Sequence, residues 1–332
     1  MFLRDHWYVG ALSRDVGRQP RQSWMLGQPV VVFRKQNGDP VAMSDRCPHR
    51  HAPLSLGTLI GDEIQCRYHG MQFDCSGSCT LVPGETSIPA ALRVPTFRVV
   101  EKYGLLWIWM GDAQEADESR LPEWPWCERP GFETYRGAFQ IDAPFQMIVD
   151  NLMDLTHVHF VHRILGIGNL VHESEPMEVW QEGDRVRFRR KLKKEPAGEF
   201  YVEIGGHYLP PSVVITSGVP MRVGSTEMQP GPVSQVLHCL TPKDAVSTLY
   251  FVMKCWNVTT REHEIAAMDY QNEVTVGEDK AIIEAQWRTK TAFDPADSEK
   301  LIRADRAAVM SRRVFEKLSR GELGEAVADT QQ

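Results

Sequence analysis

The sequence lacks any long apolar stretch. Its longest purely apolar runs are short, such as residues 105–110 in a chain of 332 residues, whereas a membrane-spanning helix needs about 20 such residues. The first residues, MFLRDHWYVG, also lack the apolar stretch and the small-residue cleavage site of a signal peptide. We therefore expect a cytoplasmic protein without a membrane span.

The sequence is also short of basic residues. Its 37 Lys and Arg are outnumbered by 44 Asp and Glu, for a net charge of −7, and no basic cluster of the kind that follows a phosphate backbone occurs. Nucleic acid is therefore a poor candidate partner. Seven cysteines cannot all pair with one another. In a reducing compartment, cysteines that lie near histidines indicate metal binding before disulfides.

What is present is an ordinary globular composition, with 42% hydrophobic and 24% charged residues, in a chain long enough for two domains. The first third consists of short β-type runs between turns. Residues 29–34 and 41–44 flank Asn37 and Gly38, a strong hairpin signal because both residues tolerate a positive φ. Residues 105–111 are typical of a buried strand that closes this small β domain.

The stretch 111–131 is acidic at first and then rich in Pro and Trp, as at a domain boundary. We predict an all-β domain over residues 1–115 and a second domain over residues 116–332. The second domain mixes a helix, strands and two late helices, predicted at 144–161, at 185–192, 236–240 and 249–256, and at 262–276 and 297–318. This order indicates an α+β fold with an antiparallel sheet and carboxyl-terminal helices.

Two Cys-His pairs lie in one loop-rich stretch. Cys47-x-His49 and Cys66-x-x-His69 are sixteen residues apart and offer two thiolates and two imidazoles. Zinc accepts such a set, but Cys-x-His is tighter than the usual spacing of structural zinc ligands. In a two-iron cluster, one iron can take both thiolates and the other both imidazoles, so that each loop supplies one ligand to each iron.

This stretch resembles the Rieske [2Fe-2S] family, whose motif is C-x-H followed by C-x-x-H. The resemblance implies that Cys47, His49, Cys66 and His69 hold the cluster. Met71 departs from the commonest pattern, in which Trp follows His-Gly, and we expect this change to alter packing and not ligation. The remaining cysteines are expected to be small core or surface residues.

A second cluster of histidines lies in NLMDLTHVHFVH, residues 151–162. On an ideal helix His159 and His162 share a face, whereas His157 and His162 are about 140° apart. The segment nevertheless resembles the N-x2-D-x2-H-x4-H signature of Rieske non-haem iron oxygenases, matched by Asn151, Asp154, His157 and His162. The resemblance implies that His157 and His162 bind a mononuclear Fe(II), and we expect a widened helical turn there.

The third ligand of such an iron is a carboxylate. Residues 276–285, VGEDKAIIEA, resemble a helix of aromatic O-demethylase oxygenases in which the Asp of an E-D-K run is the ligand. This resemblance selects Asp279, with Glu278 as the second choice. It also implies that Asp154 links His69 of one subunit to His157 of its neighbour, and therefore that the protein is a homotrimer.

The resemblance covers nearly the whole chain and points to the oxygenase component of the vanillate and dicamba O-demethylase group. It implies a helix-grip-like catalytic domain, a Rieske [2Fe-2S] cluster, a mononuclear Fe(II) and O2 as co-substrate. Because no G-x-G-x-x-G motif occurs, NAD(P)H would act only through a separate flavin and [2Fe-2S] reductase or a ferredoxin.

The expected reaction is oxidative O-demethylation of a methoxylated aromatic acid. His238 and Tyr270 fall at positions that resemble substrate contacts of the group, and Ser217 and Trp256 are weaker candidates; His238 is alternatively a hydrogen-bonded core residue. Ring or methyl hydroxylation, dioxygenation and N-demethylation are alternatives within the family. An electron carrier or iron-sulfur sensor is the alternative outside it.

Overall fold

The computed structural model describes residues 2–162, 176–193, 200–222, 233–257, 262–294 and 299–321. The chain divides into two compact units. The first is Phe2–Leu121 with Thr241–Ala245, and the second is Pro122–Leu240 with Val246–Gln332. The domain boundary at 115/116 stays a prediction, six residues before this division.

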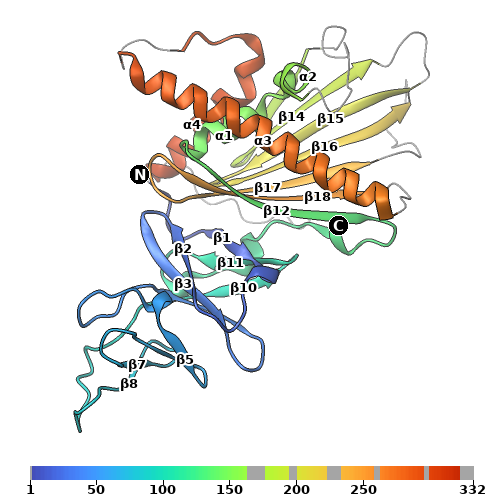
Figure 1. Ribbon diagram of the computed structural model, residues 1–332. Coiled ribbons are helices and arrows are strands. Elements are labelled where there is room, and N and C mark those ends of the chain that lie inside the picture. Colours follow the sequence, from blue (N-terminus) through green and yellow to red (C-terminus); the bar gives the residue numbers. More distant parts are fainter. Residues whose placement is uncertain are drawn as a thin grey trace. The chain divides into compact units, whose positions relative to one another are not determined.

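The first unit is all β in its described residues, apart from short 3₁₀ turns (Figure 1). It contains three sheets, whose strand orders are β1-β11-β10, β2-β3-β4-β9 and β5-β6-β7-β8. The strands are β1 (Trp7–Leu12), β2 (Arg21–Met25), β3 (Gln28–Arg34), β4 (Pro40–Ser44), β5 (Thr58–Ile60), β6 (Glu63–Gln65), β7 (Gln72–Phe73), β8 (Cys79–Leu81), β9 (Thr96–Phe97), β10 (Val99–Lys102) and β11 (Leu105–Trp109).

The predicted hairpin and closing strand are both confirmed. Strands β3 and β4 pair antiparallel around the turn, in which Gly38 has a φ of 93°. All five residues of β11 are buried, because this strand lies between β1 and β10 and packs on both faces.

The second unit is built on a seven-stranded sheet with the order β12-β18-β17-β16-β15-β14-β13. Its strands are β12 (Glu133–Ile141), β13 (Glu178–Glu182), β14 (Arg185–Lys193), β15 (Phe200–Leu209), β16 (Val213–Arg222), β17 (Ser234–Pro242) and β18 (Thr248–Trp256). Three of them cover the predicted strands. Strands β12, β13, β15 and β16 were not predicted. In β15, Gly205-Gly206 interrupts the apolar alternation, and a Cβ on Gly206 would lie 2.1 Å from the carbonyl oxygen of Ile215.

The helices of this unit gather on one face of the sheet (Figure 1). Helix α1 (Phe145–Met153) contacts β15 and β16, α3 (Glu262–Ala292) contacts β12, and α4 (Arg306–Ser319) contacts β13 and β14. Helix α3 carries a buried stripe of Asn272, Val276, Asp279 and Ile283. The i, i+4, i+7, i+11 spacing places these four side chains on one face, toward the sheet.

Three of the predicted helix bounds were wrong. The helix predicted at 144–161 ends at Met153, and the one predicted to end at 276 continues to Ala292. Helix α4 starts only at Arg306, after a 3₁₀ turn, and residues 299–302 are not helical, while 297 and 298 lie outside the described residues. None of the helices in the described residues is long and apolar enough to cross a membrane.

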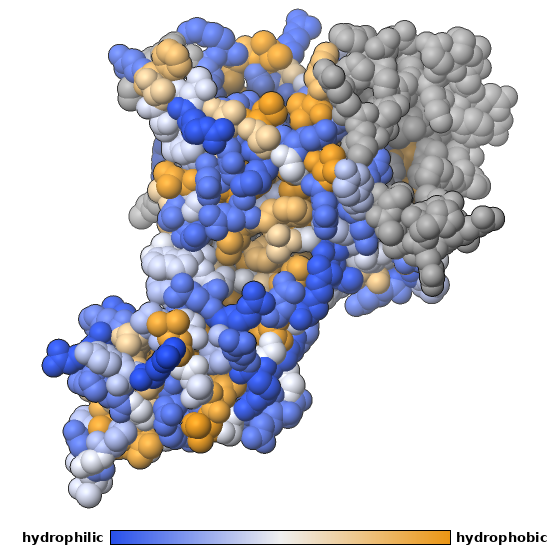
Figure 2. All heavy atoms as spheres, viewed as in Figure 1, coloured by the Kyte–Doolittle hydropathy of each residue, from blue (hydrophilic) through white to orange (hydrophobic). Residues whose placement is uncertain are grey.

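The α+β fold class is confirmed, with a β-rich amino-terminal unit and a sheet covered by helices that come largely from the carboxyl-terminal part of the chain. Figure 2 shows hydrophilic residues, in blue, over much of the visible face of each unit, with apolar residues in orange between them.

Candidate metal centres

The two Cys-His loops of the first unit have the same backbone design. In each loop the Cys N–H donates to the carbonyl five residues on, from Cys47 to Ala52 at 2.9 Å and from Cys66 to Met71 at 2.8 Å. The residue four positions after each Cys donates back to the Cys carbonyl, at 2.9 Å in both loops. That residue has a positive φ in both cases, 60° at His51 and 73° at Gly70.

These loops separate sulfur from nitrogen. Cys47 and Cys66 are each 2% exposed and pack in the core with Met71, which supports a packing role for that residue. His49 and His69 are exposed, and their ring centroids lie 4.6 Å apart at an interplanar angle of 59°. Two buried thiols and two adjacent exposed imidazoles on the same pair of loops fit the divided donor set of a Rieske cluster.

Opposing effects act on the pKa of the Cys47 thiol. Burial and, to a lesser extent, the neighbouring Cys66 raise the pKa of this thiol to about 11, against the backbone N–H groups of His49 and Arg50, which favour the thiolate. A bound iron would reverse the effect of burial, because a coordinating thiol is deprotonated outright. The N–H groups then become hydrogen-bond donors to a cluster ligand.

The second His-rich segment is not a continuous helix. Helix α1 ends at Met153, and Asp154 is extended, with φ −125° and ψ 98°. A 3₁₀ turn, Leu155–His157, and a short helix, α2 (Val158–Val161), follow. The expectation of a widened turn was therefore wrong, because helix α1 ends and a 3₁₀ turn, which is tighter than an α-helix, follows. The Asp154 carboxylate accepts the Thr156 N–H at 2.9 Å and caps the new turn.

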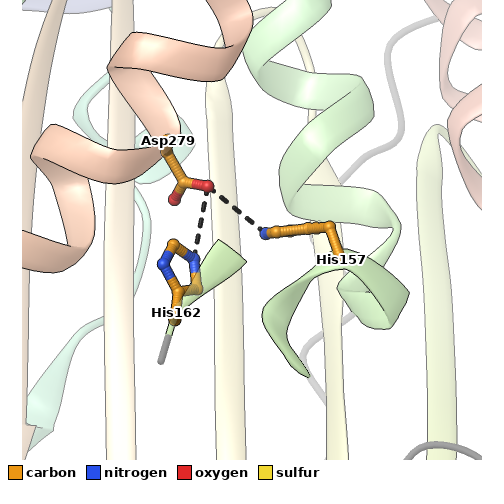
Figure 3. A group of neighbouring side chains, drawn as sticks. All are labelled: His157, His162 and Asp279. Carbon is orange, nitrogen blue, oxygen red and sulfur yellow. Dashed lines mark ion pairs between the residues drawn. The ribbon is translucent and has the colours of Figure 1, made fainter. Parts of the chain in front are cut away.

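This break brings His157 and His162 together with Asp279 of α3 (Figure 3). One oxygen of Asp279 lies 3.4 Å from Nε2 of His157 and 3.3 Å from Nε2 of His162. The potential ligand atoms of the three residues lie within 4.8 Å of one another. His162 and Asp279 are buried and His157 is partly buried.

Both imidazoles are held by their other nitrogen. Nδ1 of His157 lies 2.6 Å from the carbonyl oxygen of Asp154, and Nδ1 of His162 lies 3.0 Å from Oε2 of Glu278. A carbonyl or carboxylate oxygen can only accept, so each Nδ1 carries a hydrogen, and in the neutral ring each Nε2 then keeps its lone pair. The tautomer assigned in this way is the one that binds a metal through Nε2.

Burial and neighbouring groups act in opposite directions on the pKa values of Asp279 and His162. Burial by itself would raise the pKa of the Asp279 carboxyl, but His157 and His162 hold that pKa far below its usual range. Burial likewise opposes the charged form of His162, yet Asp279 and Glu278 raise its pKa. Asn151 donates from Nδ2 to Asp279 at 3.2 Å. A carboxylate facing two imidazole nitrogens fits the 2-His-1-carboxylate donor set of non-haem iron.

The structure separates the two acidic candidates for the third ligand. Asp279 faces both Nε2 atoms, whereas Glu278 lies on the Nδ1 side of His162. Neighbouring residues of a helix project about 100° apart. The sequence alone does not show which of these directions faces the two histidines, so both residues stayed candidates. Nothing is described of the side chain of His159.

The predicted substrate contacts fall in different surroundings. His238 is buried, with Nε2 2.9 Å from Thr216 Oγ1 and Nδ1 2.6 Å from the Tyr250 hydroxyl. Burial lowers its pKa to about 3, so the ring is neutral. Both ring nitrogens are thus engaged inside the protein. Tyr270 is 64% exposed, and Trp256 is buried in the core. Substrate contacts by His238 and Tyr270 stay predictions.

Three features of the site were missed from the sequence. They are the Asp154 main-chain carbonyl on His157, the Glu278 carboxylate on His162, and the hydroxyls of Thr216 and Tyr250 on His238. The E-D-K run is the available signal for Glu278. It indicates a candidate metal ligand and does not indicate the contact with His162. The other contacts join segments that no local pattern connects.

Paired Cys-His loops and a His-His-Asp group on one chain define the class of Rieske non-haem iron oxygenases. The model of the Rieske [2Fe-2S] domain matches residues 6–98, and that of the vanillate O-demethylase oxygenase C-terminal domain matches residues 141–321. The chain therefore belongs to the group of vanillate and dicamba O-demethylase oxygenase components.

This chain and the proteins similar to it match over nearly the whole length of both. The dicamba O-demethylase oxygenase component of Stenotrophomonas maltophilia is 31% identical over 97% of this chain and 99% of its own. A putative toluene-4-sulfonate monooxygenase iron-sulfur subunit of Comamonas testosteroni is 31% identical over 98% and 99%. The crystal structure of dicamba monooxygenase bound to dicamba matches with a TM-score of 0.87 and 30% identity, covering 97% and 98% of the two chains.

The chain is thus the oxygenase component of a Rieske monooxygenase, with a [2Fe-2S] cluster and a mononuclear iron as cofactors. Such a component receives its electrons from a separate reductase or ferredoxin. The alternative of an electron carrier or sensor is set aside, because the family match extends over the catalytic unit.

Proposed function

We propose that this oxygenase removes a methyl group from oxygen on a methoxylated aromatic acid. The observation that carries the proposal is the convergence of His157 and His162 on Asp279, in a chain similar to dicamba and vanillate O-demethylases. The reaction takes O2, two electrons and two protons. It yields water and a hydroxylated methyl group, which leaves as formaldehyde and frees the phenol.

We assign the ligands as follows. Cys47 and Cys66 hold one iron of the cluster, and His49 and His69 hold the other. His157, His162 and Asp279 hold the mononuclear iron, which supplies the activation of O2 when it is bound.

The protein groups behind these ligands orient them. Asp154 accepts from His157, Glu278 accepts from His162, and Asn151 donates to Asp279. With both Nδ1 hydrogens committed, each imidazole turns Nε2 toward the same point, which limits the reorganisation needed to bind the metal. A ligand set held in this way would hold the iron through three protein groups, and the bound iron would supply the activation of O2.

We also propose that the functional assembly is a homotrimer in which Asp154 connects the cluster of one subunit to the iron of the next. Asp154 is partly exposed, and its carboxylate Oδ1 accepts a hydrogen bond from the Thr156 N–H. The His69 ring is exposed as well. A carboxylate bonded to a metal-bound imidazole can fix that ring and couple the two centres.

Formaldehyde release tests the reaction. The purified protein, loaded with iron and supplied with a reductase and NADH, is incubated with methoxybenzoic acids that differ in ring position. Release of formaldehyde with matching formation of the phenol is expected for at least one acid, and His162→Ala should abolish it while leaving the red-brown cluster spectrum unchanged. A colourless protein with stoichiometric zinc would contradict the cluster assignment.

A second candidate function is hydroxylation or N-dealkylation within the same chemistry. It is supported by similarity to a chloroacetanilide N-alkylformylase oxygenase component of Rhizorhabdus wittichii, 31% identical over 97% of both chains, and to the toluene-4-sulfonate monooxygenase subunit. Hydroxylated product from toluene-4-sulfonate, with no formaldehyde from any methoxybenzoic acid, would replace the first proposal with this one.

A further inference from the structure

A lysine lies on the inner face of the sheet in the catalytic unit. Along β18, the side chains of Tyr250, Val252 and Trp256 belong to the core cluster that also contains Val276 of α3. Successive residues of a strand point to opposite faces, so Lys254, between Val252 and Trp256, points to the same side as these residues. Its side chain is only partly buried.

Lys254 has a neutral partner. Its ammonium donates to Oδ1 of Asn272, on the buried stripe of α3, at 3.0 Å. Burial lowers the pKa of Lys254, and no carboxylate in the described part of the chain offsets this effect. An ammonium can donate three hydrogen bonds, and removing part of its hydration is costly unless other partners replace the water.

Two further donors in this region are unused. Asn272 is 7% exposed and Trp256 is 2% exposed, and neither the Asn272 amide nitrogen nor the Trp256 indole nitrogen has an acceptor among the described residues. Trp256 follows Lys254 by two residues on the same face of β18. A buried donor without a partner costs about 1–3 kcal/mol, so Asn272, which contacts Lys254, and Trp256, two residues along β18, would both gain from a ligand that only accepts.

We propose that Lys254, Asn272 and Trp256 bind the anionic headgroup of the aromatic substrate. A carboxylate or a sulfonate presents acceptor oxygens and a negative charge, which matches a site made of donors and one positive charge. The inference deepens the proposed function and rests on it for the identity of the substrate as an aromatic acid.

The position of this site along α3 constrains the substrate. Asn272 precedes Asp279 by seven residues, which is about 10 Å along the helix. Val276 lies between them on the buried stripe of the helix and belongs to the same core cluster as Val252 of β18. A headgroup beside Lys254 and an oxidised carbon beside the iron ligands must therefore lie at opposite ends of the ring. We infer that para- and meta-substituted acids fit and ortho-substituted acids do not.

Calorimetric titration of the iron-loaded full chain tests the site. The probes are 4-methoxybenzoate, toluene-4-sulfonate, 2-methoxybenzoate and the neutral 4-methoxybenzamide. Lys254→Met removes the charge at similar volume, and Asn272→Asp places a carboxylate that pairs with Lys254 and repels the anion. Lys290→Met, on the exposed end of the same helix, is the matched control.

The wild type should bind the para acids more tightly than 4-methoxybenzamide and 2-methoxybenzoate. Both site variants should weaken the para acids at least about 10-fold and change the amide by less than about threefold, with iron content unchanged. The control should behave as wild type. The carboxylate and sulfonate arms show which headgroup is preferred.

Equal binding of the para acids by the wild type and Lys254→Met would overturn the inference, as would a wild type that binds none of the anions. Lys254-dependent binding of an acid that yields no formaldehyde would leave the headgroup site standing and remove O-demethylation. Formaldehyde release that is insensitive to both variants would do the reverse.

Discussion

At the scale of single residues, we propose that Glu278 orients the iron ligand His162 without binding the metal itself. Glu278 holds Nδ1 of His162 at 3.0 Å, and loss of such a partner costs about 10–100-fold in metal affinity. Glu278→Ala should therefore weaken Fe(II) binding by this factor, whereas Glu278→Gln, whose amide oxygen still accepts, should stay within a few-fold of wild type.

Iron retained at graded chelator concentrations measures this effect, with the cluster spectrum as an internal reference. Glu273→Ala, at an exposed position of the same helix, is the control. If Glu278→Ala retains iron as strongly as Glu278→Gln, the hydrogen bond has no part in holding the metal.

His238 gives the catalytic unit a pH dependence. Burial lowers its pKa to about 3, against about 6.5 in the unfolded chain. As the pH falls from 6.5 toward 3, the unfolded chain takes up a proton that the folded chain does not, so the free energy of unfolding falls by about 1.4 kcal/mol per pH unit. Above pH 6.5 both states are neutral and the effect is absent.

Between pH 6.5 and pH 5 the wild type should therefore lose about 2 kcal/mol more than His238→Gln, which cannot titrate. Urea unfolding of both proteins at several pH values measures the difference. Parallel pH profiles would show that the folded protein accepts a proton at His238 as easily as the unfolded chain does.

At the scale of elements, the break after α1 decides the geometry of the iron site. The Asp154 carboxylate caps the 3₁₀ turn and its carbonyl holds His157. Asn caps about as well as Asp, and Ala costs about 1 kcal/mol. Asp154→Asn should therefore keep stability and iron, while Asp154→Ala should lower the unfolding free energy by about that amount.

The two variants separate capping from electron transfer. If the carboxylate connects the two metal centres, both variants should slow oxidation of the reduced cluster by O2 and substrate at least about 10-fold, since one hydrogen-bond acceptor between the imidazoles is lost. Stopped-flow absorbance of the cluster follows this step. A wild-type rate in Asp154→Asn would leave the residue with its capping role alone.

Much of this element could be predicted from the sequence, but not its shape. The spacing of Asn151, Asp154, His157 and His162 identified the segment through a family motif. Helical periodicity would have paired His159 with His162 instead, and nothing local announces that the helix stops at Met153. The break is stabilised by the capping of Asp154 and by contacts with α3, more than a hundred residues away, which local pattern does not contain.

At the scale of the whole molecule, both metal motifs could be recognised in the sequence. The members of each Cys-His pair, and the two histidines of the second motif, lie within a few residues of one another. The proposed third iron ligand, Asp279, lies more than a hundred residues from His162, and a family resemblance was needed to select it. The Lys254–Asn272 contact was not foreseen for the same reason, since it joins a strand to a helix through one hydrogen bond.

The proposed trimer predicts that turnover needs metal centres from two different subunits. If electrons pass from the cluster of one subunit to the iron of its neighbour, a chain without a cluster and a chain without iron can complement each other. His69→Ala and His162→Ala should each be inactive alone. Co-expressed in equal amounts, they should form mixed rings in which about a quarter of the positions join an intact iron to an intact neighbouring cluster.

Such mixed assemblies should recover about a quarter of the wild-type turnover per subunit, and the mixture of separately purified variants should recover none until the subunits are allowed to exchange. Light scattering fixes the number of subunits, and turnover of the co-purified hybrid reads the path. A hybrid ring that stays inactive, although each variant keeps its remaining metal, would require the electron to travel within one chain, and the link from His69 through Asp154 to His157 would then have no function between subunits.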